Sequence, residues 1–322
     1  MMHMFKLLPS LLLVVLLTGC LPEDERVVPF DRGDVETQQV EMGSTYADQV
    51  YFDFSAGAVV NSVPKESWDL RIDRAGDAIQ LRLNSSKYML AAESSVTVWE
   101  ALQNDDGLVY RWDPSDGSLR LALENWQEAD RLFVLDRGYT AAGSVIGKVK
   151  AGFARNAAGG LNIRFGALSG TAQTVLEIAL EEGRTYVSLE GNGEVVPVET
   201  GPDWDIVFTQ YTTSLWDGSD TISYLVTGVL IHPEGVLATK DTAYTFAEID
   251  AEIAREMPLV SLSDVVGFDW KEYNFDQARF QVLEGINYVL QDAEGFLIKF
   301  RFLDFYNEQG EKGAPLFEYQ IL

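Results

Sequence analysis

Residues able to perform acid–base or metal chemistry are scarce in this chain. It has two histidines and one cysteine in 322 residues, and only His232 lies beyond the first twenty. A single histidine excludes most catalytic triads and metal cages. The sequence has no nucleophile elbow, no zinc-ligand spacing, no phosphate-binding glycine loop and no calcium-loop spacing. Carboxylates are numerous, so an acidic hydrolase working with two of them stays open as the least favoured reading. We therefore predict a protein that is not an enzyme.

Cys20 is the residue whose setting predicts a covalent modification. Lys6 precedes a largely apolar run over 7–17, and Leu17-Thr-Gly-Cys20 places small residues before the cysteine. This pattern is typical of a secretory signal that ends in a lipobox. The run is also shorter than the roughly 20 residues that a membrane-spanning helix needs. We predict a signal peptide over 1–19 and a lipid on Cys20 that attaches the protein to a membrane; a signal cleaved elsewhere, with Cys20 a stray thiol, is the alternative.

The charge of the chain limits its partners. It carries 50 acidic residues against 24 Lys and Arg, a formal net charge of −26, which repels nucleic acids and anionic lipid headgroups. A hydrophobic content of 47% argues against acidic disorder. Polar residues 20–45 predict a flexible tether. The acidic stretch after Cys20 resembles the surface-export signal of Bacteroidota lipoproteins, which predicts display on the outer membrane.

The remaining sequence predicts strands. Phe296, Ile298, Phe300 and Phe302 alternate with polar residues, the period of two of a half-buried strand, and Asp- and Gly-rich turns separate such segments. One amphipathic helix is expected over 245–257, where Thr245 and Glu248 form a capping-box pattern. An all-β fold with few short helices follows.

Similar motifs occur twice in the same order. Trp68-Asp69, which follows a Tyr51-Phe-Asp-Phe strand, is matched by Trp204-Asp205, which follows Tyr186-Val-Ser-Leu. Two further echoes, Tyr88-Met-Leu-Ala with Gly235-Val-Leu-Ala and 156–165 with 292–300, come later. We predict two tandem copies of one antiparallel β unit, over 46–182 and 183–322, in which Trp68 and Trp204 are equivalent packing residues.

The second copy resembles the HmuY-type haem-binding lipoprotein family of Bacteroidota. The resemblance rests on Asp203-Trp-Asp-Ile-Val-Phe208, on Thr227-Gly-Val-Leu230 and above all on the ending from Tyr288 to Gln320. It covers about 140 residues, and the first copy fits the same outline more loosely. The resemblance implies an all-β fold, lipid anchoring and, in members that bind haem, a pair of axial His or Met ligands.

The implied haem site has few possible ligands here. A pair of histidines within one chain is excluded, so His232 and Met257 are the candidates for iron, with core packing the plainer role for Met257. Met42 and Met89 are weaker candidates. Tyr211 and Trp216 lie in a segment that is longer in the second copy, and they are expected to stack on a flat ligand if its loops converge with His232.

Three functional classes remain open at this stage. The favoured one is a surface protein that binds haem or a related flat ligand. The second is a lipoprotein of the same fold that binds another ligand or assists an outer-membrane receptor system. An acidic hydrolase is the third. A haem titration separates the first from the others.

Overall fold

Four main antiparallel sheets build the protein, as the alternating hydrophobic pattern predicted. The computed structural model describes residues 33–198 and 204–322. Cys20 and the signal peptide lie outside these residues, as does the first half of the predicted tether, 20–32. The all-β prediction is confirmed. Within the described ranges, no helix is long and apolar enough to cross a membrane.

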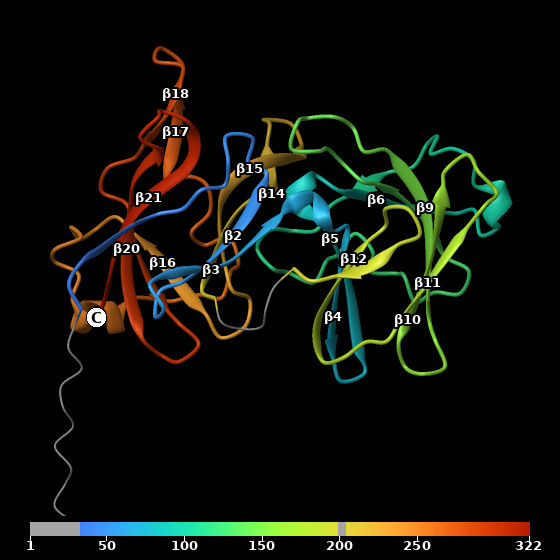
Figure 1. Cartoon of the computed structure of the whole chain (residues 1–322), viewed down its shortest axis with the longest axis horizontal. Helices are drawn as coiled ribbons and strands as arrows, with labels where there is room; N and C mark the ends of the chain where they lie inside the picture. The colour runs from blue at the N-terminus through green and yellow to red at the C-terminus, as the bar shows by residue number, and fades with distance from the viewer. Residues whose placement is uncertain (1–32, 199–203) are drawn as a thin grey trace, which may run out of the picture. The chain divides into compact units, whose positions relative to one another are not determined.

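Two sheets are formed entirely by residues 70–196, which we call the continuous module (Figure 1). Its four-stranded sheet has the order β13 (Glu194–Val196), β12 (Gly183–Ser188), β4 (Leu70–Ala75) and β5 (Ala78–Leu83). Its six-stranded sheet has the order β11 (Thr174–Ile178), β10 (Leu161–Ala167), β9 (Lys148–Arg155), β8 (Leu132–Asp136), β6 (Leu90–Ser94) and β7 (Tyr110–Arg111).

The other two main sheets combine the beginning and the end of the described chain, 36–64 with 206–321, which we call the interrupted module. One has the order β3 (Ala58–Pro64), β2 (Asp48–Asp53), β14 (Ile206–Trp216) and β15 (Thr221–Ile231). The second has the order β1 (Glu36–Gln39), β21 (Lys312–Ile321), β20 (Leu297–Tyr306), β19 (Asn287–Gln291) and β16 (Leu237–Asp241). A small hairpin joins β17 (Lys271–Asn274) to β18 (Arg279–Val282).

The two modules repeat one strand order. The sheet β13-β12-β4-β5 corresponds to β3-β2-β14-β15, and β11-β10-β9-β8-β6 corresponds to β1-β21-β20-β19-β16. Each apolar face packs into its own core, one cluster running from Leu70 to Leu189 and the other joining Val40–Phe54 to 206–319. Equivalent lysines mark the match, since Lys150 donates to the carbonyls of Trp99 and Leu102, and Lys299 to those of Phe246 and Ile249.

The sheets do not follow the predicted boundary at 182/183. Strands β1 to β3 precede the continuous module in sequence but pair with β21 and β14 of the interrupted module. Their counterparts β11 to β13 follow β10 and stay with the continuous module. If the chain is divided before β11, the first repeat holds β1–β10 and the second holds β11–β21. Strands β1–β3 of the first repeat then pair with strands of the second, and β11–β13 of the second pair with strands of the first. Residues 32–322 form one compact body as a result.

Two local expectations are corrected. The tether predicted to reach residue 45 ends earlier, because β1 joins the sheet and Val40 and Met42 are buried in the core.

The predicted helix is shorter as well. Thr245 and Glu248 form their capping hydrogen bonds around a turn, whereas extended Asp250 caps the separate helix α1 (Ala251–Glu256). Short 3-10 helices span Lys65–Ser67, Ser85–Lys87 and Trp99–Ala101.

Candidate functional site

The four predicted ligand-binding residues do not lie together. Trp216 pairs with Thr221 at the tip of the β14–β15 hairpin, whereas His232 follows Ile231, the partner of Ile206 at the other end. Ten residues of extended strand separate the two ends, roughly 33 Å. The loops expected to converge are therefore the two ends of one long hairpin.

His232 is enclosed by protein contacts. Its side chain lies against Trp204, with ring centroids 4.4 Å apart, and the residue is 2% exposed. Its Nε2 is 3.3 Å from a guanidinium nitrogen of Arg184. Nδ1 lies 2.8 Å from the carbonyl oxygen of Glu234 and 3.0 Å from the backbone amide nitrogen of the same residue. Both ring nitrogens are thus engaged by the protein itself.

The other three candidates are dispersed. Met257 ends helix α1 and borders a shallow surface depression with Tyr244 and Glu256. Tyr211 is buried in β14, where burial and the nearby carboxylates Asp264 and Asp269 raise the pKa of its hydroxyl. Trp216 is 68% exposed. No two of these side chains face a common cavity with His232, so the structure does not form the expected aromatic wall beside an imidazole.

The weaker candidates Met42 and Met89 are both core residues. Within the described ranges, no group of three His, Cys, Asp or Glu side chains is arranged to hold a metal ion. The residues present therefore do not fit an axial pair of haem ligands, because the one histidine is engaged and the methionines lie elsewhere.

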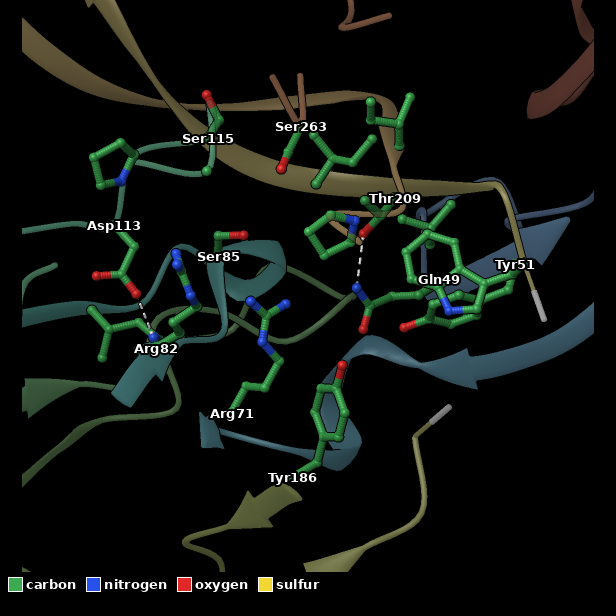
Figure 2. A pocket seen from close by; sticks show the side chains of 18 of the residues that line it. Gln49, Tyr51, Arg71, Arg82, Ser85, Asp113, Ser115, Tyr186, Thr209 and Ser263 are labelled. Atoms are coloured by element: carbon green, nitrogen blue, oxygen red, sulfur yellow. Dashed lines mark hydrogen bonds between the residues drawn. The ribbon is translucent and has the colours of Figure 1, made fainter. Parts of the chain in front are cut away.

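A cavity between the two modules gathers polar and charged side chains that the sequence did not single out. This inter-module cavity has a volume of about 320 Å³ (Figure 2). Its lining combines aromatic rings, two arginines, an amide, a carboxyl and several hydroxyls. The lining residues are Gln49, Tyr51, Trp68, Arg71, Arg82, Leu83, Ser85, Asp113, Pro114, Ser115, Gly117, Tyr186, Trp204, Val207, Thr209, Leu230, Ile231, Pro233, Ser261 and Ser263.

Two equivalent aromatic pairs hold this cavity open. Trp68 packs edge-on against Tyr186, with centroids 5.0 Å apart, and Trp204 packs in the same way against Tyr51 at 5.1 Å. In each pair, the tryptophan lies just before β4 or β14, and the tyrosine belongs to the neighbouring strand, β12 or β2. All four rings are largely buried but border the cavity, so they serve both the framework and the site.

Polar side chains tie the modules together at the same place. Gln49 of β2 accepts a hydrogen bond from the Trp68 ring nitrogen at 2.9 Å and donates one to Thr209 of β14 at 3.0 Å. Figure 2 shows the Gln49–Thr209 bond across the cavity from Arg71 and Arg82. These two bonds fix the orientation of the Gln49 amide at the cavity wall.

Asp113 lies at the other end of the cavity. Its carboxyl accepts hydrogen bonds from the backbone amides of Leu83 at 2.6 Å and Ala122 at 2.8 Å. Burial raises the pKa of Asp113 despite these bonds. It organises the loop rather than presenting a free carboxylate.

Comparison with known proteins agrees with the resemblance seen in the sequence. Residues 45–174 match the family model described as HmuY protein. Apo PinO from Porphyromonas gingivitis is 11% identical, with coverage of 90% of this chain and 98% of that chain and a TM-score of 0.32. The apo HmuY analog of Tannerella forsythia is 8% identical, with coverage of 91% and 98% and a TM-score of 0.32.

No curated protein matches the chain. The family match lies over the first predicted copy, whereas the motifs noted in the sequence are strongest in the second. The two modules share one strand order. The predicted resemblance to the HmuY family is confirmed, and residues 45–174 carry it.

Proposed function

We propose that this chain is a lipid-anchored binding protein of the HmuY type that holds a flat organic ligand in the inter-module cavity. One observation carries the proposal: the cavity places the Trp68–Tyr186 and Trp204–Tyr51 pairs around a preformed space that also contains cationic and hydroxyl groups. Aromatic walls with a few fixed polar groups are the usual composition of small-molecule sites.

The site is tested with a substitution that blocks its mouth. Ser261 lines the cavity and is exposed, so Ser261→Trp should obstruct entry at little cost to stability. Titration calorimetry with 2-naphthoate and its neutral analogue 2-naphthamide should show binding to the wild type and loss of binding in this variant. Ser144→Trp, on an exposed loop that does not line the cavity, is the matched control. Equal binding by all three proteins, or none by the wild type, would contradict the proposal.

Haem is the ligand that the family resemblance suggests, and the geometry favours the alternative of a different flat ligand. His232 would have to leave Arg184 and the Glu234 carbonyl before it could bind iron. We therefore expect His232→Ala to leave the absorption spectrum of protein mixed with haem unchanged in the Soret region, in both oxidised and reduced samples. A Soret band shown by the wild type and lost from this variant would identify His232 as an axial ligand and reverse the assignment.

Membrane attachment is a separate prediction. The lipobox ending in Cys20 supports a diacylated lipoprotein, displayed at the outer membrane and able to pass its ligand to a receptor there. In cells that express the full chain, Cys20→Ser should move the protein from the membrane fraction to a soluble fraction. Thr18→Ser, which keeps a small residue before the cysteine, should stay with the membrane. Membrane fractionation unchanged by Cys20→Ser would refute the anchor.

A further inference from the structure

The inter-module cavity has two chemically different walls at equivalent positions. Arg71 of β4 and Arg82 of β5 are direct cross-strand partners, so their side chains share one face. In the interrupted module, the positions with the same place in the sheet are Val207 and Leu230, which are also direct partners. Both pairs line the cavity. One wall is therefore cationic and the corresponding wall is apolar.

The arginine pair is unfavourable by itself. Like charges placed directly opposite each other in an antiparallel sheet repel. The carboxylate of Asp73 contacts both guanidiniums, with its oxygens 2.8 Å from Arg71 Nε and 2.9 Å from Arg82 Nε. Burial, together with the neighbouring Arg71, holds the pKa of Arg82 below its ordinary value. An anionic group placed beside these two partly desolvated cations would be stabilised by both of them.

Two carboxyls among the described residues, those of Asp113 and Glu234, have partners of their own. Asp113 is directed at two backbone amides. Arg184, which faces Asp73 from β12, pairs with Glu234 at 3.0 Å. An anionic group that enters the cavity can approach the arginine pair, with the Tyr186 ring beside it and the apolar wall opposite (Figure 2).

We infer that the natural ligand carries a carboxylate at one end of a flat apolar body, with the carboxylate bound by Arg71 and Arg82 and the body packed against Trp204, Val207 and Leu230. This inference rests on the proposed function and specifies its ligand class. Guanidinium groups suit this task because their planar donors match the two oxygens of a carboxylate. The opposite wall supplies apolar contact without a competing charge.

The test compares an acid with its amide. For the wild type, calorimetry should give at least about ten-fold tighter binding of 2-naphthoate than of 2-naphthamide, the gain expected from charge-assisted hydrogen bonds. In the double variant Arg71→Gln/Arg82→Gln this preference should disappear while amide binding persists. Arg74→Gln is the control, because Arg74 is on the same strand but bonds to the Gly76 and Leu180 carbonyls outside the cavity.

Each outcome has a distinct meaning. Equal binding of acid and amide by the wild type would overturn the carboxylate inference and leave the proposed binding site standing. Binding of neither compound would overturn both. Because the acid-to-amide ratio is measured on the wild-type protein, the inference stays testable even if the double variant is poorly folded. Loss of the preference in Arg74→Gln as well would assign it to general surface charge and also overturn the inference.

Discussion

Replacing Asp69 by Asn should lower the free energy of unfolding by about 3–5 kcal/mol, whereas the same change at Asp205 should raise it at neutral pH. The Asp69 carboxylate is fully buried, 2.5 Å from Lys87 Nζ, and it accepts two bonds from Arg137 at 3.0 Å. Although burial alone raises it, these two cations hold the pKa of Asp69 below its ordinary value. Asparagine would leave buried Lys87 without the carboxylate that it contacts, and Arg137 with Glu190 alone.

Asp205 occupies the equivalent place with the opposite surroundings. Asp69 accepts a bond from the amide of Leu189, and Asp205 accepts the matching bond from Phe54. Where Arg137 directly follows β8, however, Asp292 directly follows β19, the corresponding strand. Burial raises the pKa of Asp205 to about 7, and the carboxylates of Asp53, Asp292 and Glu294 add to the effect.

The pH dependence follows from that shift. The unfolded chain ionises Asp205 near pH 4, while the folded protein retains the proton up to about pH 7. The folded state binds more protons in this window, so the stability contributed by this residue falls as the pH rises from 4 to 7. Asparagine keeps the acceptor for Phe54 and removes the charge, so Asp205→Asn should gain on the order of 2 kcal/mol at pH 8 and less at pH 5.

Urea unfolding of the wild type and both variants at pH 5 and pH 8 measures these effects. The essential result is the difference in sign at pH 8. If Asp205→Asn is destabilising by the same amount at both pH values, its carboxyl is not held protonated, and the asymmetry between the two modules has no energetic role.

Truncating either framework tryptophan should be equally severe. Trp68 and Trp204 are 6% and 7% exposed, and each packs on a tyrosine of an exchanged hairpin. We expect Trp68→Ala and Trp204→Ala each to cost about 3–5 kcal/mol in chemical unfolding, from lost contact area and the cavity left behind. Trp216→Ala is the matched control, because that side chain is 68% exposed and its loss should change stability by less than about 0.5 kcal/mol. Similar losses in all three variants would show that the burial of the pair is not what stabilises the protein.

The sequence predicted the strands well because alternation records which side of a strand is buried. It also predicted the equivalence of Trp68 and Trp204, both of which are buried in matching contacts. Alternation does not record which strand is the neighbour, so the exchange of β1–β3 and β11–β13 was not foreseen. The repeated motifs noted in the sequence are compatible with strands that pair within one repeat and with strands that pair between repeats.

The site was harder to predict for the same reason. The longer segment of the second copy and the single histidine beyond the signal peptide led to the prediction of Trp216 and His232 as site residues. These two residues lie at opposite ends of one hairpin. Arg71 and Arg82 each lie between two apolar residues, a pattern that is equally typical of the solvated face of a strand. A signal was nevertheless present, because aligning the two repeats by their Trp-Asp motifs sets Arg71 against Val207, a charge in one copy where the other is apolar.

The strand exchange also determines the order in which the protein can fold. Strand β1 pairs with β21, and Glu36 is the partner of Tyr319. The first described strand therefore cannot pair until almost the last residues of the chain are in place. Contacts between residues so distant in sequence form slowly, because a long loop must close before they stabilise anything. The continuous module lies within one stretch of sequence and can form first. We expect the interrupted module, whose strands come from both ends of the described chain, to complete its pairing later, and the cavity between the modules with it.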